Sequence, residues 1–407
     1  MSSTLHIITC EYAPQAGGVA DYARLVAEGL AAAGEEVHVW CRSPAGGEDA
    51  GGVETGARGV TVHRECGGFA PRDLRRLGRR LDAVRGPRRL LVQYVPHGFG
   101  YRSMNVALCA WLWARAAARG DCVELMVHEP FLAFGEGRLR QNAAALVHRL
   151  MTSMLLRAAG RVWVSTPAWE RAWRPYALGR RVPFAWLPVP CTIPVGEDAA
   201  GVASARARYA GDAGTRLIGH LGTYGRHVSE YLPRLAPALL CGHGRDAALL
   251  LLGRGSERAR EELIGRDARL AARVHAAGYL EPRDLSAHLA ACDLLLQPYP
   301  DGVSSRRTSV MAGLAHGLAV VTTRGRLTEP LWEASGAVAL APADDPGAIT
   351  STAARLLDDP VERARLGARA RALYLERFDL AHTVAALRRA HDGRDGAARL
   401  TPAKVKA

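Results

Sequence analysis

The sequence has no apolar run that could cross a bilayer, since none approaches the roughly 18–20 residues that a membrane span requires. Its first residues, MSSTLHIITC, lack the basic region of a signal peptide and are typical of a β-strand. The sequence therefore predicts a cytoplasmic protein.

Paired cysteines are also lacking. The eight cysteines are scattered along the chain, without a CxxC motif or a cluster with histidine. This spacing predicts neither a disulfide framework nor a metal site, and Cys10, Cys109 and Cys292 fit the interiors of strands and helices as small apolar residues. A reduced cytoplasmic environment is the simplest explanation. We expect neither a metal nor a cofactor.

Lysine is nearly absent, because only Lys404 and Lys406 occur, and the positive charge is carried by arginine. The formal net charge of +13 fits a polyanion, a membrane surface or a phosphorylated substrate as partner. Abundant arginine, alanine and glycine are also typical of a GC-rich bacterial coding sequence, so composition alone explains part of the charge. No zinc finger and no motif of aromatic and basic residues is present, and we expect no nucleic-acid partner.

What the sequence does contain is a repeated alternation of strand and helix patterns. One series begins at Leu5–Thr9 and a second at Leu217–Leu221, and the proline-rich stretch 183–204 between them predicts a linker. With 407 residues, of which 48% are hydrophobic, the chain can build two domains. Each series predicts an α/β, doubly wound, Rossmann-like domain that binds ligands at the carboxyl ends of its strands. We expect the two to face each other across a cleft that holds the active site.

Residues 292–323 predict a strand, a loop, a helix and a further strand. The apolar run Leu294–Leu296 predicts the first strand, and the helix is expected to begin at Ser304. A helix N-terminus carries unpaired N–H groups and a partial positive charge, so neighbouring hydroxyls and arginines there favour a diphosphate site. A helix cap with solvated arginines is the alternative. The candidate donor-binding residues of this unit are Ser304, Ser305, Arg306, Arg307 and Thr308.

Other loops of the second series have similar chemistry. Glycine and arginine follow its first two strands, in the sequences GTYGR (222–226) and GRG (253–255), and Gly278 follows the third. Backbone N–H groups and arginines in such loops favour a nucleotide diphosphate, although each arginine could instead be an ordinary surface residue. The candidates in these loops are Thr223, Arg226, Arg254 and Tyr279.

The first series has candidates at three strand ends. Gly17 and Gly18 follow the first strand and would let a ligand approach the backbone; their GGVxD sequence is not the dinucleotide pattern GxGxxG. A tight turn is the alternative. His97 follows the strand 88–95, and His128 with Glu129 ends the next one. Such histidines are usually structural, but at successive strand ends they are candidates for positioning a substrate.

The order of these motifs resembles the GT-B glycosyltransferases of the retaining family 4 type. The resemblance rests on GGVADYARLVAEGLAAAGEEVHVW, VQYVPH, VHEP, the proline linker, LGTYGR, LLLGRG, GYLEPRDL and AHGLAVVTT, and it covers nearly the whole chain. It implies an N-terminal acceptor domain at 1–190, a C-terminal donor domain at 191–374, and a helix at about 375–392 that returns to the first domain.

The resemblance also implies an activity, which is transfer of a hexosyl unit from a UDP- or GDP-sugar to an acceptor hydroxyl with retention. The sugar nucleotide is then a substrate rather than a cofactor. His97, His128 and Glu129 would have the catalytic positions, and the residues named in the second series, with Gly17 and Gly18, would bind the donor. A surface glycan, a lipid carrier and a natural-product aglycone are all open as acceptors.

The sequence departs from the family pattern at the motif E-x7-E, whose two glutamates would fall on Ser304 and Ala312. Neither residue is acidic, so a non-catalytic relative that binds nucleotide sugars is an alternative. The arginine that is common after the first strand of the donor domain is replaced by Thr223, which leaves Arg226 as the nearby cation.

A basic stretch, 72–89, allows two interpretations. It holds eight arginines, with Leu74, Leu77 and Leu81 on one helical stripe. Such a helix could lie on an anionic bilayer as a peripheral membrane contact. The interpretation that we favour is that the leucines pack on the sheet while the arginines are solvated.

Overall fold

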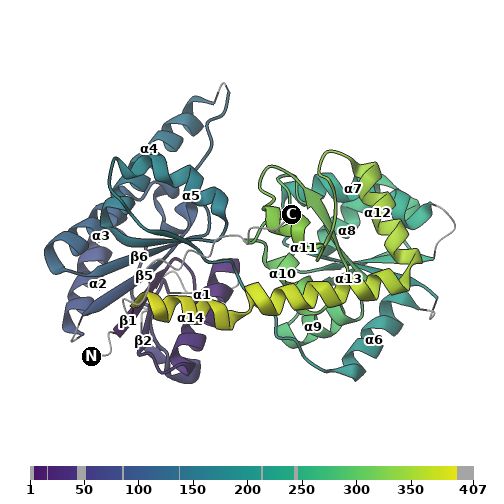
Figure 1. The fold of residues 1–407 in the computed structure, drawn as a ribbon, viewed down its shortest axis with the longest axis horizontal. Coiled ribbons are helices and arrows are strands. Elements are labelled where there is room, and N and C mark those ends of the chain that lie inside the picture. Colours follow the sequence, from purple (N-terminus) through teal and green to yellow (C-terminus); the bar gives the residue numbers. More distant parts are fainter. Residues whose placement is uncertain are drawn as a thin grey trace. The chain divides into compact units, whose positions relative to one another are not determined.

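The computed structural model describes residues 4–15, 17–43, 52–84, 87–136, 138–211, 214–242 and 246–391, without the side chains of 226–230 and 391 (Figure 1). The chain divides into two compact units. One contains the chain as far as Pro188 together with the segment that begins at Leu380, and the other is Val189–Asp379. They are called here the N-terminal unit and the C-terminal unit.

The N-terminal unit is built on an eight-stranded sheet in the order β3-β4-β2-β1-β5-β6-β7-β8. All neighbouring strands pair in parallel except β3 with β4. The strands are β1 (Thr4–Thr9), β2 (Val37–Trp40), β3 (Val53–Thr55), β4 (Thr61–His63), β5 (Arg88–Tyr94), β6 (Cys122–Val127), β7 (Ala159–Val164) and β8 (Phe184–Trp186). The helices are α1 (Gly18–Ala32), α2 (Pro71–Ala83), α3 (Val106–Arg119), α4 (Leu139–Ala158), α5 (Pro167–Trp173) and α14 (Leu380–His391), with short turns at Ala57–Gly59, Pro96–Phe99, Tyr101–Ser103 and Arg174–Ala177.

The last helix, α14, packs against α1, far from it in the sequence. Gly29 of α1 permits the close approach, because a Cβ there would lie 2.9 Å from Cγ2 of Val384. Arg388 Nε also donates a hydrogen bond to Glu35 Oε1 at 2.9 Å. The segment after Leu380 is thus part of the N-terminal unit.

The C-terminal unit has a six-stranded, parallel sheet in the order β11-β10-β9-β12-β13-β14. The strands are β9 (Arg216–Leu221), β10 (Ala247–Leu252), β11 (Val274–Gly278), β12 (Leu294–Gln297), β13 (Val320–Arg324) and β14 (Ala339–Pro342). The helices are α6 (Ala199–Ala210), α7 (Arg226–Cys241), α8 (Ser256–Arg266), α9 (Pro282–Ala290), α10 (Thr308–Ala315), α11 (Pro330–Ser335), α12 (Pro346–Asp358) and α13 (Pro360–Leu373), with turns at Ala268–Leu270 and Tyr374–Phe378. The order reverses between β9 and β12, which is the switch point where such sheets bind ligands.

Two doubly wound α/β units are therefore present, as the alternating pattern of the sequence predicts. The physical reason is visible in the strands. β10 is apolar throughout and buried at every position, as expected of a parallel strand with helices on both faces.

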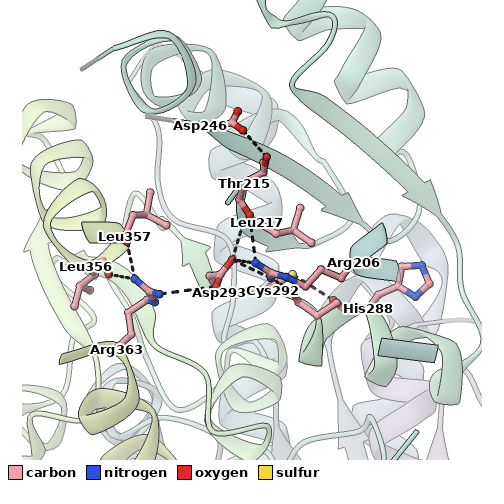
Figure 2. A network of polar contacts seen from close by, with 11 residues as sticks. Arg206, Thr215, Leu217, Asp246, His288, Cys292, Asp293, Leu356, Leu357 and Arg363 are labelled. Atoms are coloured by element: carbon pink, nitrogen blue, oxygen red, sulfur yellow. Dashed lines mark hydrogen bonds and ion pairs between the residues drawn. The ribbon is translucent and has the colours of Figure 1, made fainter. Parts of the chain in front are cut away.

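At the amino-terminal edge of the second sheet, one carboxylate joins four elements (Figure 2). Asp293 Oδ2, just before β12, accepts hydrogen bonds from both terminal nitrogens of Arg206, each at 3.0 Å, and from the backbone N–H of Leu217 at 2.8 Å. Arg363 of α13 lies 3.9 Å from its other oxygen. This network ties α6, β9, β12 and α13 together at the edge opposite the strand ends that carry the candidate residues.

Helix α2 settles the interpretation of the basic stretch. Leu74, Leu77 and Leu81 are all buried, whereas the exposed positions of the helix include Arg75 and Arg79. The leucines are thus buried within the N-terminal unit, as the favoured interpretation requires. Bilayer docking through this leucine stripe is excluded, because the stripe is already covered by protein.

Replacing Leu77 by alanine should therefore destabilise the N-terminal unit by about 2–5 kcal/mol, because the change removes buried apolar contacts and leaves a cavity. Chemical denaturation followed by tryptophan fluorescence measures this. Arg75→Ala on the exposed face is the matched control and should change stability by less than about 0.5 kcal/mol. Equal effects of the two substitutions would contradict the placement of α2.

Candidate functional site

Three loops lie side by side at the carboxyl edge of the C-terminal sheet. The backbone N–H of Gly253, after β10, donates to the carbonyl of Gly278 at 3.0 Å, and that of Gly222, after β9, donates to Leu252 at 3.0 Å. Gly253 has φ +109°, and a Cβ there would lie 2.3 Å from the carbonyl oxygen of Gly222. Only glycine permits this contact, which brings the loops after β9, β10 and β11 together.

These loops hold four of the predicted donor-binding residues. Arg254 and Tyr279 are both exposed, and the Arg254 guanidinium lies over the Tyr279 ring at 4.8 Å from its centroid. Thr223 belongs to the neighbouring loop, where a Cβ on Gly255 would lie 3.7 Å from its carbonyl oxygen. Arg226 is the first residue of α7, and its side chain lies outside the described part of the chain.

The helix after β12 begins later than predicted. We expected it to open at Ser304, but α10 begins at Thr308, with Arg307 as its N-cap. The reason is that the preceding residues are held by other elements: Val303 N–H donates to the carbonyl of Thr323 at 2.8 Å, and the carbonyl of Ser305 accepts from Val189 at 3.1 Å. Thr308 is therefore at the helix N-terminus, whereas Ser304 and Ser305 lie in the loop before it.

A carboxylate that the sequence analysis missed anchors this loop. Glu329 Oε1 accepts hydrogen bonds from the backbone N–H of Ser305 at 3.0 Å and from its hydroxyl at 2.6 Å. Its other oxygen accepts from Trp332 Nε1 at 2.6 Å. Glu329 is thus bound on both oxygens, and its action on the site is to position the backbone of the loop after β12.

A second carboxylate, Asp301, binds both arginines of the loop. Arg306 donates to Asp301 Oδ2 at 2.7 Å, and Arg307 donates to Oδ1. Burial alone would raise the pKa of Asp301, but Arg307 and Arg306 outweigh it and hold the pKa below its usual value. Arg307 also lies over the ring of Tyr299, 4.4 Å from its centroid. The two guanidinium groups are thereby held in place by the same carboxylate.

The positions of the two family glutamates are both buried. Ala312 lies in α10, and its side chain and that of Ser304 are both fully buried. Among the described residues, none forms a hydrogen bond with the Ser304 hydroxyl. A buried hydroxyl in that state is uncommon in proteins and is often found where a ligand binds.

In the N-terminal unit, the two glycines at the start of α1 have different surroundings. A Cβ on Gly17 would lie 2.3 Å from Glu11 Oε1, and that oxygen accepts from the backbone N–H of Ala20 at 3.2 Å. Gly17 thus makes room for a carboxylate at the start of α1, which the sequence analysis missed. Gly18 is exposed and has open space around its Cα.

The candidates after β5 and β6 come together. His97 and Glu129 are both exposed, and His97 Nδ1 lies 3.5 Å from Glu129 Oε2. The Glu129 carboxylate raises the pKa of His97, since it favours the protonated imidazole. The pair therefore lies at the carboxyl edge of the N-terminal sheet, where the carboxylate favours the protonated form of the ring.

His128 has the opposite character. It is half-buried at the end of β6, with its Nε2 at 2.8 Å from Gln93 Oε1 and its ring edge-on to Tyr22. Burial lowers its pKa to about 4, so the ring is neutral near pH 7. Because a carbonyl oxygen can only accept, Nε2 carries the proton and Nδ1 is left as an acceptor.

Two protein-family models match the chain, and between them they cover most of it. The model described as "Glycosyl transferase 4-like domain" matches residues 17–190, and the one described as "Glycosyl transferases group 1" matches residues 215–359. The chain belongs to the GT-B glycosyltransferases. The resemblance seen in the order of the sequence motifs is thereby confirmed, and the protein is a glycosyltransferase.

Solved structures of this fold align with the chain along nearly its whole length. Sucrose-phosphate synthase from Thermosynechococcus elongatus aligns with TM-score 0.69 at 18% identity, over 96% of this chain and 99% of that one. HepE from Anabaena, in complex with UDP and glucose, aligns with TM-score 0.68 at 15% identity, over 96% and 100%. The UDP-forming trehalose-phosphate synthase from Burkholderia xenovorans aligns with TM-score 0.72 at 14% identity, over 96% and 100%. No curated protein sequence matches the chain.

Titration of the two histidines tests the geometry of the N-terminal candidates. The Glu129→Gln substitution should lower the pKa of His97 toward the ordinary histidine value of 6.5, because the carboxylate that stabilises the charged ring is gone. NMR titration of the imidazole signals measures this shift. His128 is the internal control and should stay neutral down to about pH 4 in both proteins. An unchanged pKa of His97 would contradict the pairing with Glu129.

Proposed function

We propose that this glycosyltransferase moves a hexosyl unit from a UDP- or GDP-sugar to an acceptor hydroxyl with retention of configuration. The observation that carries the proposal is the set of arginines and hydroxyls at the carboxyl edge of the C-terminal sheet, beside the switch point between β9 and β12. Two of the aligned structures bear on the donor: HepE was crystallised with UDP and glucose, and the trehalose-phosphate synthase is described as UDP-forming.

Arg306 and Arg307 would neutralise the donor diphosphate. A diphosphate is a strongly anionic group, and charge-assisted hydrogen bonds from two guanidinium groups would stabilise it. Their ion pairs with Asp301 hold them in place before the donor arrives, which reduces the cost of ordering them. The Ser304 hydroxyl, Thr308 at the start of α10 and the loop backbone would supply further hydrogen bonds.

This arrangement suits a reaction in which the leaving diphosphate itself helps to deprotonate the acceptor hydroxyl. The enzyme then has to stabilise charge that develops on the diphosphate, and a strong protein base is not required. The absence of glutamates at positions 304 and 312 is compatible with such a mechanism. Two carboxylates, Asp301 in this loop and Glu329 just before α11, position the loop's arginines and its backbone instead.

In the N-terminal unit, His128 and the His97–Glu129 pair would orient the sugar and the acceptor. His128 is neutral near pH 7 and has an acceptor nitrogen for a hydroxyl group. His97, whose pKa is raised, would donate to an oxygen. Such contacts position groups for reaction, and their loss should affect turnover more than nucleotide affinity.

Arg306→Ala and Arg307→Ala test the proposal. Each substitution removes a charge-assisted contact worth about 2–4 kcal/mol in the transition state, so kcat/KM should fall roughly tens- to hundreds-fold. The donor for the assay is the sugar nucleotide that raises Tm most in a thermal-shift panel, since binding stabilises the folded state. Arg258→Ala, on the exposed face of α8, is the matched control and should keep wild-type kinetics. If both loop variants also keep wild-type kinetics, the diphosphate binds elsewhere.

A further inference from the structure

Ser305, which directly precedes the two arginines of the loop after β12, is bonded through all three of its polar groups. Its N–H and its hydroxyl donate to Glu329 Oε1 at 3.0 and 2.6 Å. Its carbonyl accepts from the N–H of Val189 at 3.1 Å. Because Ser305 is also fully buried, the backbone from which the arginine pair starts is fixed by two other parts of the chain.

The first of these partners leads to an aromatic pair. The second oxygen of Glu329 accepts from Trp332 Nε1 at 2.6 Å. The Trp332 ring is fully buried and stacks on the ring of Phe378, with centroids 5.6 Å apart and an angle of 13° between the planes. One carboxylate and one indole thus connect Ser305 with Phe378, which lies far from it in the sequence.

The second partner leads to a tyrosine. Two residues after Val189, the N–H of Cys191 donates to the hydroxyl oxygen of Tyr374 at 3.2 Å. Pro190 lies between the two, and it restricts both its own φ and the conformation of Val189, so this part of the linker is stiff. Burial raises the pKa of the Tyr374 hydroxyl, which therefore stays neutral near pH 7. The position of the Val189 N–H, and with it that of the Ser305 carbonyl, depends on this tyrosine.

Both routes end in one π-helical turn, Tyr374–Phe378, which lies between α13 and α14. The N–H of Asp379 donates to the carbonyl of Tyr374, five residues before it, at 3.0 Å. The turn also contacts α10, the helix that follows the two arginines. Single π-helical turns are rare in proteins and often occur at functional sites. Two separate routes of bonds and ring contacts therefore converge from this turn on the same residue of the donor loop.

We infer that the turn Tyr374–Phe378 positions the loop that binds the donor diphosphate, with Tyr374 and Trp332 as positioning residues. Neither residue contacts the donor in this account. They hold Ser305, and Ser305 sets the place from which the two arginine side chains start. A backbone that is already fixed reduces the cost of ordering the loop when the diphosphate binds. The inference rests on the proposed function, because it takes the loop after β12 as the diphosphate site.

The test removes one polar group from each route. Tyr374→Phe deletes the hydroxyl that binds Cys191, and Trp332→Phe deletes the indole N–H that binds Glu329. Isothermal titration measures the affinity of the full chain for UDP and uridine, and for GDP and guanosine. For the base that the wild-type chain binds, each variant should bind the diphosphate about two- to tenfold more weakly, as expected for the loss of one hydrogen bond. Nucleoside affinity should not change, and this selectivity separates positioning from a general loss of stability.

Combining the two substitutions tests whether the routes act on the same loop. The double variant should lose at least the product of the two single losses, because either route alone still holds Ser305. Circular dichroism establishes that each variant is folded at the temperature of the titration. Tyr374→Phe, which removes a single oxygen atom, provides the test if Trp332→Phe does not fold.

Equivalent bonds elsewhere in the chain provide matched controls. Tyr231→Phe removes a tyrosine hydroxyl that donates to the carbonyl of Ala343, also in the C-terminal unit. Trp163→Phe removes a buried indole N–H that donates to Glu124 Oε2 at 2.6 Å, in the N-terminal unit. Both control variants should keep the wild-type affinity for the diphosphate.

The inference is overturned if Tyr374→Phe binds the diphosphate as tightly as the wild-type chain, or if nucleoside and diphosphate affinities fall together. It is also overturned if the control variants lose as much affinity, or if the double variant falls short of the product. The Arg306→Ala, Arg307→Ala double variant separates this failure from that of the donor proposal. If it loses diphosphate affinity while Tyr374→Phe does not, only the role of the turn is wrong. If the wild-type chain does not prefer the diphosphate, both are wrong.

Discussion

The loop after β12 depends on two carboxylates, one from outside the loop and one within it. Glu329 binds the backbone and hydroxyl of Ser305, and Asp301 binds the guanidinium groups of Arg306 and Arg307. Without Glu329, the segment before α10 would lose the partner of a buried N–H group. Without Asp301, the two guanidinium groups would lose the carboxylate that binds both of them. The geometry proposed for the donor diphosphate follows from these contacts.

The same contacts suggest how a chain without the usual glutamates can still serve a glycosyltransferase. The positions of those glutamates are held by a buried serine and a buried alanine, Ser304 and Ala312. The acidic groups of the loop are turned instead toward positioning the arginines and the backbone. In the mechanism that we propose, positive charge near the diphosphate would stabilise the charge that develops on this leaving group.

Local patterns predicted the fold well, because strand and helix periods and glycine-rich turns are short-range signals. Both doubly wound units and the buried leucines of α2 were predicted correctly. The predicted start of α10 was wrong, because it depends on long-range bonds, which include those of Val303 with Thr323 and of Ser305 with Val189 and Glu329. The roles of the individual site residues stay predictions.

The most direct test of the account compares how tightly the chain binds a nucleoside and the corresponding nucleoside diphosphate. Isothermal titration with uridine, UDP, guanosine and GDP isolates the contribution of the diphosphate to affinity. For one of the two bases, the account predicts that the wild-type chain strongly prefers the diphosphate and that the Arg306→Ala, Arg307→Ala double variant loses most of this preference. A preference of the same size in both proteins would contradict the claim that these arginines bind the diphosphate.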